Sequence, residues 1–239
     1  MRFFLEGLAE AWDIVWAHEP WLVQLVVVTL KVAFISTGVA LLIGLPLGLA
    51  LGLGRFRGRG VLMTLANAGL GLPPVIVGLV FALLMFPQAP LGRFHLLFTL
   101  NGVLVAQTAL ALPIVVALTA SAVRGVAPGL LAQARAYRAR RWRVCVLALR
   151  EARVGIMAAT IAAVGSGLSE VGAVVLVGGN IDGLDQTLAS AALQRIEAAR
   201  FAEGLAIGIV LLGLILVITA ALTVLQAGGG ATRRVGRSS

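Results

Sequence analysis

The sequence predicts an all-α integral membrane protein, a polytopic bundle of about five membrane-spanning helices, and two observations support this prediction. Of its 239 residues, 60% are hydrophobic and only 12% are charged, with a mean hydropathy of +1.03, whereas about 25% of residues are charged in an ordinary soluble domain. The charged residues lie in short stretches between apolar runs, and each run is long enough to cross a bilayer, which takes about 20 residues. A single membrane domain over residues 21–226 accounts for both observations.

Five apolar runs are expected to span the membrane, over residues 22–53, 61–86, 100–123, 154–177 and 205–225. Residues 87–99 and 178–200 then form outer segments, and residues 124–153 form a long cytoplasmic segment. Residues 1–20 are expected to be an outer amphipathic segment, because Glu6, Glu10 and Asp13 stand where a signal peptide would be apolar. Residues 227–239 are expected to form a cytoplasmic basic tail.

The positive charge of the chain, +9 overall, is concentrated in three arginine blocks. The blocks are Arg55, Arg57 and Arg59; Arg124, Arg135, Arg138, Arg140, Arg141, Arg143, Arg150 and Arg153; and Arg233, Arg234 and Arg237. An excess of arginine in short loops marks the cytoplasmic face of a membrane. The charge therefore predicts an outside N-terminus and a cytoplasmic C-terminus, and it does not indicate a nucleic-acid partner.

The first span repeats glycine at four-residue spacing, at Gly44, Gly48 and Gly52. This spacing lines small residues along one helix face and allows another helix to approach closely. The partner helix could belong to the same subunit or to a second copy of the chain.

The second span contains adjacent prolines, Pro73 and Pro74, in its interior. Proline lacks a backbone donor and breaks the helical ladder, which a membrane protein tolerates where protein or a water-filled path satisfies the freed groups. We expect a kink here, beside a substrate path. Gln107 in the third span is a further polar candidate for that path.

The fourth span is interrupted by glycine and polar residues, which a regular lipid-facing helix would not carry. The candidates for a path or gate are Ser166, Ser169, Glu170, Gly172, Gly178, Gly179 and Asn180. Glycine exposes backbone N–H groups, and these groups together with hydroxyl and amide side chains can replace the water around an anion. Glu170 would repel an anion, so it either accepts backbone hydrogen bonds that hold the broken helix or acts as a gate that exchanges partners.

The cytoplasmic segment contains an apolar stripe, Leu130, Ala134 and Tyr137, at helical spacing among arginines. A short helix of this kind suits a groove on a soluble partner. The alternative is a basic amphipathic helix that lies on anionic lipid headgroups.

Catalytic and metal chemistry are not predicted. Ser166 stands between two glycines, but His18 and His95 both lie in outer segments, so no base is placed to activate a serine. The single Cys145 has no partner for a disulfide, and the sequence has no HExxH motif, cysteine pair or acidic metal cluster.

Three motifs resemble the permease subunits of tungstate ABC importers, with the molybdate and sulfate permeases as more distant relatives. They run from Gly71 to Leu79 (GLPPVIVGL), from Leu149 to Arg153 (LREAR) and from Ser169 to Ile181 (SEVGAVVLVGGNI). The resemblance covers about residues 22–226 and implies a type I importer fold. It implies two permease copies, cytoplasmic ATPases that bind the ATP, and an extracytoplasmic oxyanion-binding protein. This chain would then sit in a bacterial inner membrane, surrounded by lipid, and bind no cofactor itself.

The resemblance also implies a coupling helix that enters the ATPase. The residues concerned are Leu130, Leu131, Ala132, Gln133, Ala134, Tyr137, Arg138, Arg141 and Trp142. Relatives have a Glu-Ala-Ala triplet where this chain has Ala132-Gln133-Ala134, and a glycine where it has Arg138. They usually have Thr-Arg where this chain has Asp185-Gln186.

The expected function is therefore ATP-driven import of a tetrahedral oxyanion by alternating access, with tungstate first and molybdate or sulfate second. The alternative is a passive channel or small-solute permease that has no ATPase partner.

Overall fold

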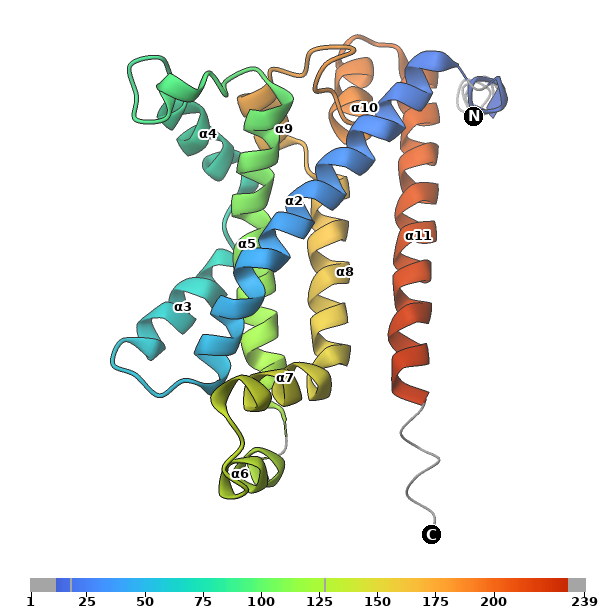
Figure 1. The fold of residues 1–239 in the computed structure, drawn as a ribbon. Helices are drawn as coiled ribbons and strands as arrows, with labels where there is room; N and C mark the ends of the chain where they lie inside the picture. The colour runs from blue at the N-terminus through green and yellow to red at the C-terminus, as the bar shows by residue number, and fades with distance from the viewer. Residues whose placement is uncertain (1–11, 18, 127, 232–239) are drawn as a thin grey trace. The chain divides into compact units, whose positions relative to one another are not determined.

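The computed structural model describes residues 12–17, 19–126 and 128–231, and in this part of the chain the secondary structure is helical, without strands. The predicted N-terminal segment and basic tail lie largely outside these residues. Figure 1 shows the helices in chain order. Their bounds are α2 Pro20–Leu53, α3 Arg59–Gly69, α4 Pro74–Leu84, η1 Gly92–Phe94, α5 Leu100–Arg124, α6 Pro128–Ala136, α7 Arg141–Glu151, α8 Arg153–Ser169, α9 Gly172–Gly178, α10 Leu188–Glu197 and α11 Phe201–Ala231.

Three described helices, α2, α5 and α11, are long and apolar enough to cross a membrane by themselves, with mean hydropathies of 2.3, 2.2 and 3.0. The pairs α3 with α4 and α8 with α9 qualify only if each bent pair is counted as one span, which raises the number to five. The all-α membrane bundle is therefore confirmed. Its two interrupted spans are those that the prolines and glycines mark in the sequence.

The chain divides into two compact units, with boundaries inside α2, α5, α8 and α11 and between α3 and α4. The first unit comprises Met1–Ser36, Leu72–Leu110 and Val164–Ile218, and the second comprises Thr37–Gly71, Ala111–Ala163 and Thr219–Ser239.

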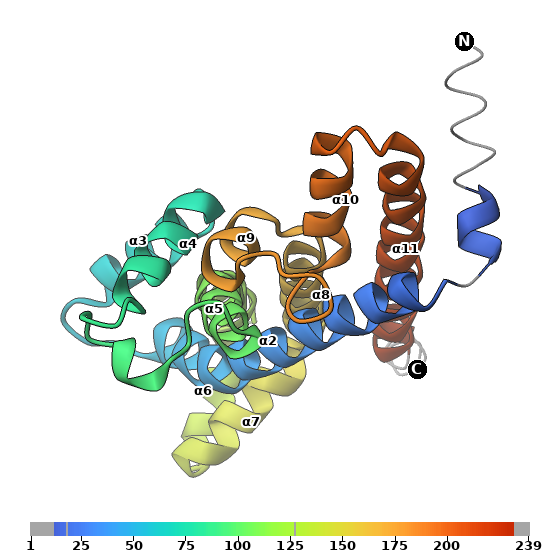
Figure 2. The same ribbon diagram turned by 90° about the horizontal axis from the view of Figure 1, so that it is seen from above.

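The first unit is built around a close contact between α4 and α9 (Figure 2). A Cβ placed on Gly78 would lie 2.6 Å from the Cα of Ala173, and one placed on Gly172 would lie 2.5 Å from Val75 Cγ2. Two glycines, one on each helix, thus allow the backbones to meet. Buried apolar residues of α2 and α5 complete this core, among them Val32 and Val103.

The second unit uses the glycine repeat of α2. A Cβ on Gly44, Gly48 or Gly52 would lie 2.7 Å from a side-chain carbon of Val115, Thr119 or Val123, respectively, and these three residues form the matching row on α5. The sequence leaves open whether the glycine repeat packs on a helix of the same subunit or of a second copy of the chain. In the structure it packs on α5 of the same subunit.

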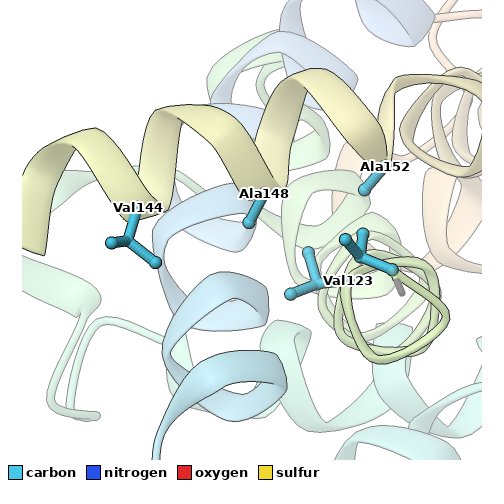
Figure 3. Packing of buried hydrophobic residues seen from close by; sticks show 5 residues of the cluster. Val123, Val144, Ala148 and Ala152 are labelled. Atoms are coloured by element: carbon cyan, nitrogen blue, oxygen red, sulfur yellow. The ribbon is translucent and has the colours of Figure 1, made fainter. Parts of the chain in front are cut away.

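Helix α7 packs on the last turn of α5 in the second unit. Val144, Ala148 and Ala152 point from one face of α7 toward Val123 (Figure 3), and all four are buried. Partly buried side chains of α2 and α6 surround this cluster, including Leu49, Leu53, Leu130 and Ala134.

Candidate functional site

The break between α3 and α4 lies at the two prolines. Pro73 is the N-cap of α4, with φ −64° and ψ 120°, and its carbonyl oxygen accepts hydrogen bonds from the N–H groups of Ile76 and Val77. Pro74 is the first helical residue, where a missing N–H leaves no hydrogen bond unmade. Both prolines are exposed. The predicted kink is thus a complete break, and the prolines form the start of a new helix.

Glu170 lies in the two-residue break between α8 and α9 and is buried. The N–H group of Ala173, in the first turn of α9, donates to Glu170 Oε1 over 3.1 Å. The carboxylate therefore satisfies one of the orphan donors at a helix start, where negative charge is also favoured by the helix dipole. Glu170 thus accepts a backbone hydrogen bond at the break in the helix, as the first of the two alternatives expected. A role of Glu170 as a gate stays a prediction.

The last turns of α8 present small residues with polar groups. Ser169 is exposed, and its hydroxyl donates to the carbonyl of Gly165 over 3.0 Å, one turn back. A Cβ placed on Gly165 would meet no atom within 4 Å. Ser166, half-buried, lies one turn before Ser169. This face is open and weakly polar, and its place on a substrate path stays a prediction.

The Gly178-Gly179-Asn180 run forms a tight end to α9. Gly178 packs so closely that a Cβ would lie 2.1 Å from Asp185 Oδ2 and 2.6 Å from Val103 Cγ2. Gly179 and Asn180 both have positive φ, 91° and 56°, which glycine adopts freely and asparagine tolerates best among other residues. Asn180 Nδ2 also donates to the Ser190 carbonyl over 3.5 Å. The motif is thereby explained by the turn, and its contribution to an anion path stays a prediction.

Polar side chains after this turn are buried. Asp185 and Gln186, which the sequence places in an outer segment, have almost no exposed surface. Asp185 Oδ1 accepts from the Ile181 N–H over 2.6 Å. Asp185 Oδ2, Gln186 Oε1 and, on α5, Gln107 Nε2 have no hydrogen-bond partner among the described residues. Burial raises the pKa of Asp185, although the hydrogen bonds from the backbone N–H groups of Ile181 and Asp185 oppose that shift.

Hydrogen bonds at the start of α10 explain why Asp185, Gln186 and Thr187 are buried in the first unit. Thr187 and Ser190 form a capping box, in which Thr187 Oγ1 accepts from the Ser190 N–H and Ser190 Oγ accepts from the Thr187 N–H. The next N–H group, that of Leu188, donates to Thr29 Oγ1 on α2 over 2.8 Å. The Thr-x-x-Ser spacing is a sequence signal for the start of this helix. Thr29, which accepts the Leu188 N–H, lies 159 residues away in the sequence.

The coupling segment forms two helices, α6 and α7. Leu130 and Ala134 are partly buried and pack on the core of their own unit, whereas Tyr137 follows α6 and is 87% exposed. The three residues do not form one free stripe, because the helix ends before Tyr137. Ala132 and Gln133 are exposed, as are Arg141 and Trp142 at the start of α7. The Leu131 side chain lies outside the described residues.

Arg138 has a left-handed backbone, with φ 53°. The N–H of the following residue, Ala139, donates to the Ala134 carbonyl over 3.1 Å. This is the hydrogen bond of a Schellman motif, in which glycine is the usual left-handed residue. The glycine that the resemblance implies at position 138 thus has a conformational reason, and arginine occupies the position under strain.

Comparison with known proteins places residues 44–228 in one protein family, described as the inner membrane component of binding-protein-dependent transport systems. A "probable anion ABC transporter permease protein" of Haloferax volcanii is 38% identical over 205 residues, which cover 84% of this chain and 88% of that protein. A "tungstate uptake system permease protein" of Peptoclostridium acidaminophilum is 27% identical and covers 95% and 99%. A "molybdenum transport system permease protein" of Azotobacter vinelandii is 29% identical and covers 73% and 81%.

Among solved structures, the inward-facing MetNI methionine ABC transporter matches with a TM-score of 0.69 over 87% of this chain and 95% of that one, at 21% sequence identity. At that identity the match identifies the fold alone. The fold of a type I importer permease, expected from the motifs, is therefore confirmed.

Proposed function

Because the chain belongs to the family of inner membrane components of binding-protein-dependent transport systems, we propose that it moves a tetrahedral oxyanion across the membrane, tungstate first and molybdate or sulfate second. The observation that carries this proposal is the set of relatives over most of the chain, whose names specify an anion, tungstate and molybdenum. The chain itself is a multi-pass transport subunit and not an enzyme. Hydrolysis of ATP is assigned to a separate ATPase.

The broken spans support a path for an anion. An ion in a low-dielectric region must have its hydration replaced by other polar groups. The open face at Gly165, Ser166 and Ser169 consists of small polar residues, and an anion could receive the Ser169 hydroxyl only if that group gave up its hydrogen bond to the Gly165 carbonyl. The Glu170 carboxylate accepts the N–H of Ala173. This hydrogen bond holds the Glu170 carboxylate at the start of α9, where the positive end of the helix dipole offsets part of its repulsion of an anion.

The break before α4 supports assembly as a homodimer. Leu72, Pro73 and Pro74 are exposed, and non-helical backbone within a bilayer must be covered by protein or face water. The apolar side chains of α4 that follow are exposed as well, and they are Val75, Ile76, Leu79, Val80 and Leu83. A second copy opposite this segment would cover the apolar face and leave the break beside a shared path.

The α6–α7 segment supports an ATPase partner on the cytoplasmic side, with the N-terminus outside. The second unit contains fourteen arginines and one carboxylate, which fits the cytoplasmic rule. Tyr137 and Trp142 are exposed aromatic groups available for insertion, and Tyr137 is the more exposed of the two. An extracytoplasmic binding protein would deliver the oxyanion at the opposite face.

The substrate is tested by uptake of labelled tungstate into cells that express this chain with the ATPase and binding protein encoded beside it. We expect uptake that depends on all three proteins, with molybdate a stronger competitor than sulfate. Equal competition by sulfate would remove the tungstate assignment, and uptake by this chain without an ATPase would support the passive-channel alternative.

The coupling surface is tested by co-purification with the ATPase. Tyr137→Asp should release the ATPase and abolish uptake. The matched control is Phe56→Asp, an exposed aromatic residue in the α2–α3 loop of the same unit, which should retain both. Loss of the ATPase from both variants, or from neither, would contradict the assignment to Tyr137.

A further inference from the structure

A cavity of about 770 Å³ lies in the second unit between the end of α2 and the start of α7. Its apolar lining includes Val144, a member of the buried cluster of Figure 3, and Leu49 and Leu53, which are partly buried and pack against that cluster. Arg55 and Arg141 contribute the charged part of the lining, and Cys145 lies among the remaining residues. The cavity thus joins an apolar floor to a basic rim. No candidate path residue lines it, whereas Arg141 also belongs to the predicted coupling segment.

The charges of the two arginines are not paired within the part of the chain that the structure describes. Neither guanidinium takes part in an ion pair among the described residues. The neighbouring Arg59 is committed elsewhere, since its Nε donates to the Leu51 carbonyl over 2.7 Å and so caps the end of α2. With one carboxylate against fourteen arginines, this unit cannot neutralise its own charge. Arg55 and Arg141 are both exposed, so the rim is open to anions from outside the chain.

The position of the cavity along α2 indicates which anion fits. Its α2 lining, from Pro46 to Arg55, comprises the last turns of a membrane-spanning helix and the residues directly after it. This is the depth at which hydrocarbon gives way to headgroups, and basic pockets at the ends of such helices bind anionic lipid headgroups. The rim is suited to a phosphate, and the apolar floor is suited to the first carbons of the acyl chains.

We propose that this cavity binds an anionic phospholipid, with its phosphate between Arg55 and Arg141 and its acyl chains against Leu49, Leu53 and Val144. The lipid would connect α2 to α7 and so influence how rigidly the coupling segment is held. This site is independent of the transported substrate, and it does not require the ATPase assignment to be correct.

Cys145, the single cysteine of the chain, reports on occupancy. The full-length chain in neutral detergent is treated with a maleimide, with phosphatidylglycerol, phosphatidylcholine or inorganic phosphate added in turn. Phosphatidylglycerol should slow labelling of Cys145, and the other two should not. Arg55→Gln and Arg141→Gln should each weaken this protection about fivefold, the equivalent of about 1 kcal/mol for one basic residue at a lipid surface.

The matched control is Arg57→Gln, an exposed arginine two residues from Arg55 that does not line the cavity; it should protect Cys145 like the wild type. Native mass spectrometry should show fewer retained phosphatidylglycerol molecules on the two rim variants alone. Equal protection by inorganic phosphate would replace the lipid with a soluble anion. Protection by the added ATPase but not by phosphatidylglycerol would make the cavity a protein-docking surface, and either result would overturn the proposal.

Discussion

Gly178→Ala tests whether the glycines of the α9 turn serve packing or only the substrate path. The added Cβ would lie 2.1 Å from Asp185 Oδ2 and 2.6 Å from Val103 Cγ2, and both neighbours are fully buried. Asp185 cannot move away without losing its hydrogen bond from Ile181. Overpacking of this kind costs ~1–3 kcal/mol, and the lost hydrogen bond adds ~1 kcal/mol, against a gain of at most ~1 kcal/mol from replacing glycine in a helix.

The expected net destabilisation is about 1–3 kcal/mol, which lowers the melting temperature of a chain of this length by roughly 2–12 °C. The assay is thermal unfolding of the full-length chain in detergent, followed by tryptophan fluorescence. Gly208→Ala is the control, because its Cβ would meet nothing within 4 Å; it should melt at or above the wild-type temperature. Combining Gly178→Ala with Asp185→Ala should cost less than the sum of the two single changes, since the clash is then absent. Wild-type stability of Gly178→Ala together with reduced uptake would refute the packing explanation.

Three further predictions concern the buried carboxylate, the strained turn and the glycine repeat. Burial raises the pKa of Asp185 in the folded state above its ordinary value of 3.8. Between these two pKa values the folded state binds more protons than the unfolded state, so stability should fall as pH rises through that range. Asp185→Asn should make the melting temperature less dependent on pH there. Arg138→Gly should raise stability by about 1 kcal/mol by relieving the left-handed strain, and a lower melting temperature would contradict the Schellman geometry. Gly48→Leu should prevent folding, because a Cβ already lies 2.7 Å from Thr119, whereas Gly213→Leu, at an open position of α11, should yield folded protein by size-exclusion chromatography.

The spans were predictable because their causes are local. A run of apolar residues must be a helix in a bilayer, and arginine lies beside one end of four of the five runs. The bounds expected for the third span, 100–123, accordingly differ from α5 by one residue. The breaks were also predictable, since Pro73-Pro74 and the Gly165–Gly172 region remove the donors or the side chains that a straight span needs. Each of these inferences depends on residues close in the sequence.

The buried polar segment was not predictable for the opposite reason. Asp185, Gln186 and Thr187 have the composition of a surface loop, and their burial depends on Thr29, which receives the Leu188 N–H from a distant helix. The glycine repeat was ambiguous in a similar way: helical periodicity identifies the face of α2, but only the fold identifies the row on α5 that it meets. The orientation of Leu130 and Ala134 likewise follows from a cluster to which five helices contribute, α6 among them.

The glycines of the path motifs differ in what explains them within the subunit. Gly172 and Gly178 are required by close contacts, and Gly179 by its positive φ. Gly165 has neither reason, because its Cβ would meet nothing and its φ is not positive, yet glycine inside a helix costs roughly 0.5–1 kcal/mol relative to alanine. The folded subunit gains nothing from that cost. The missing side chain at Gly165 therefore has no explanation within the subunit, and a role for Gly165, Ser166 and Ser169 in passage of the substrate stays a prediction.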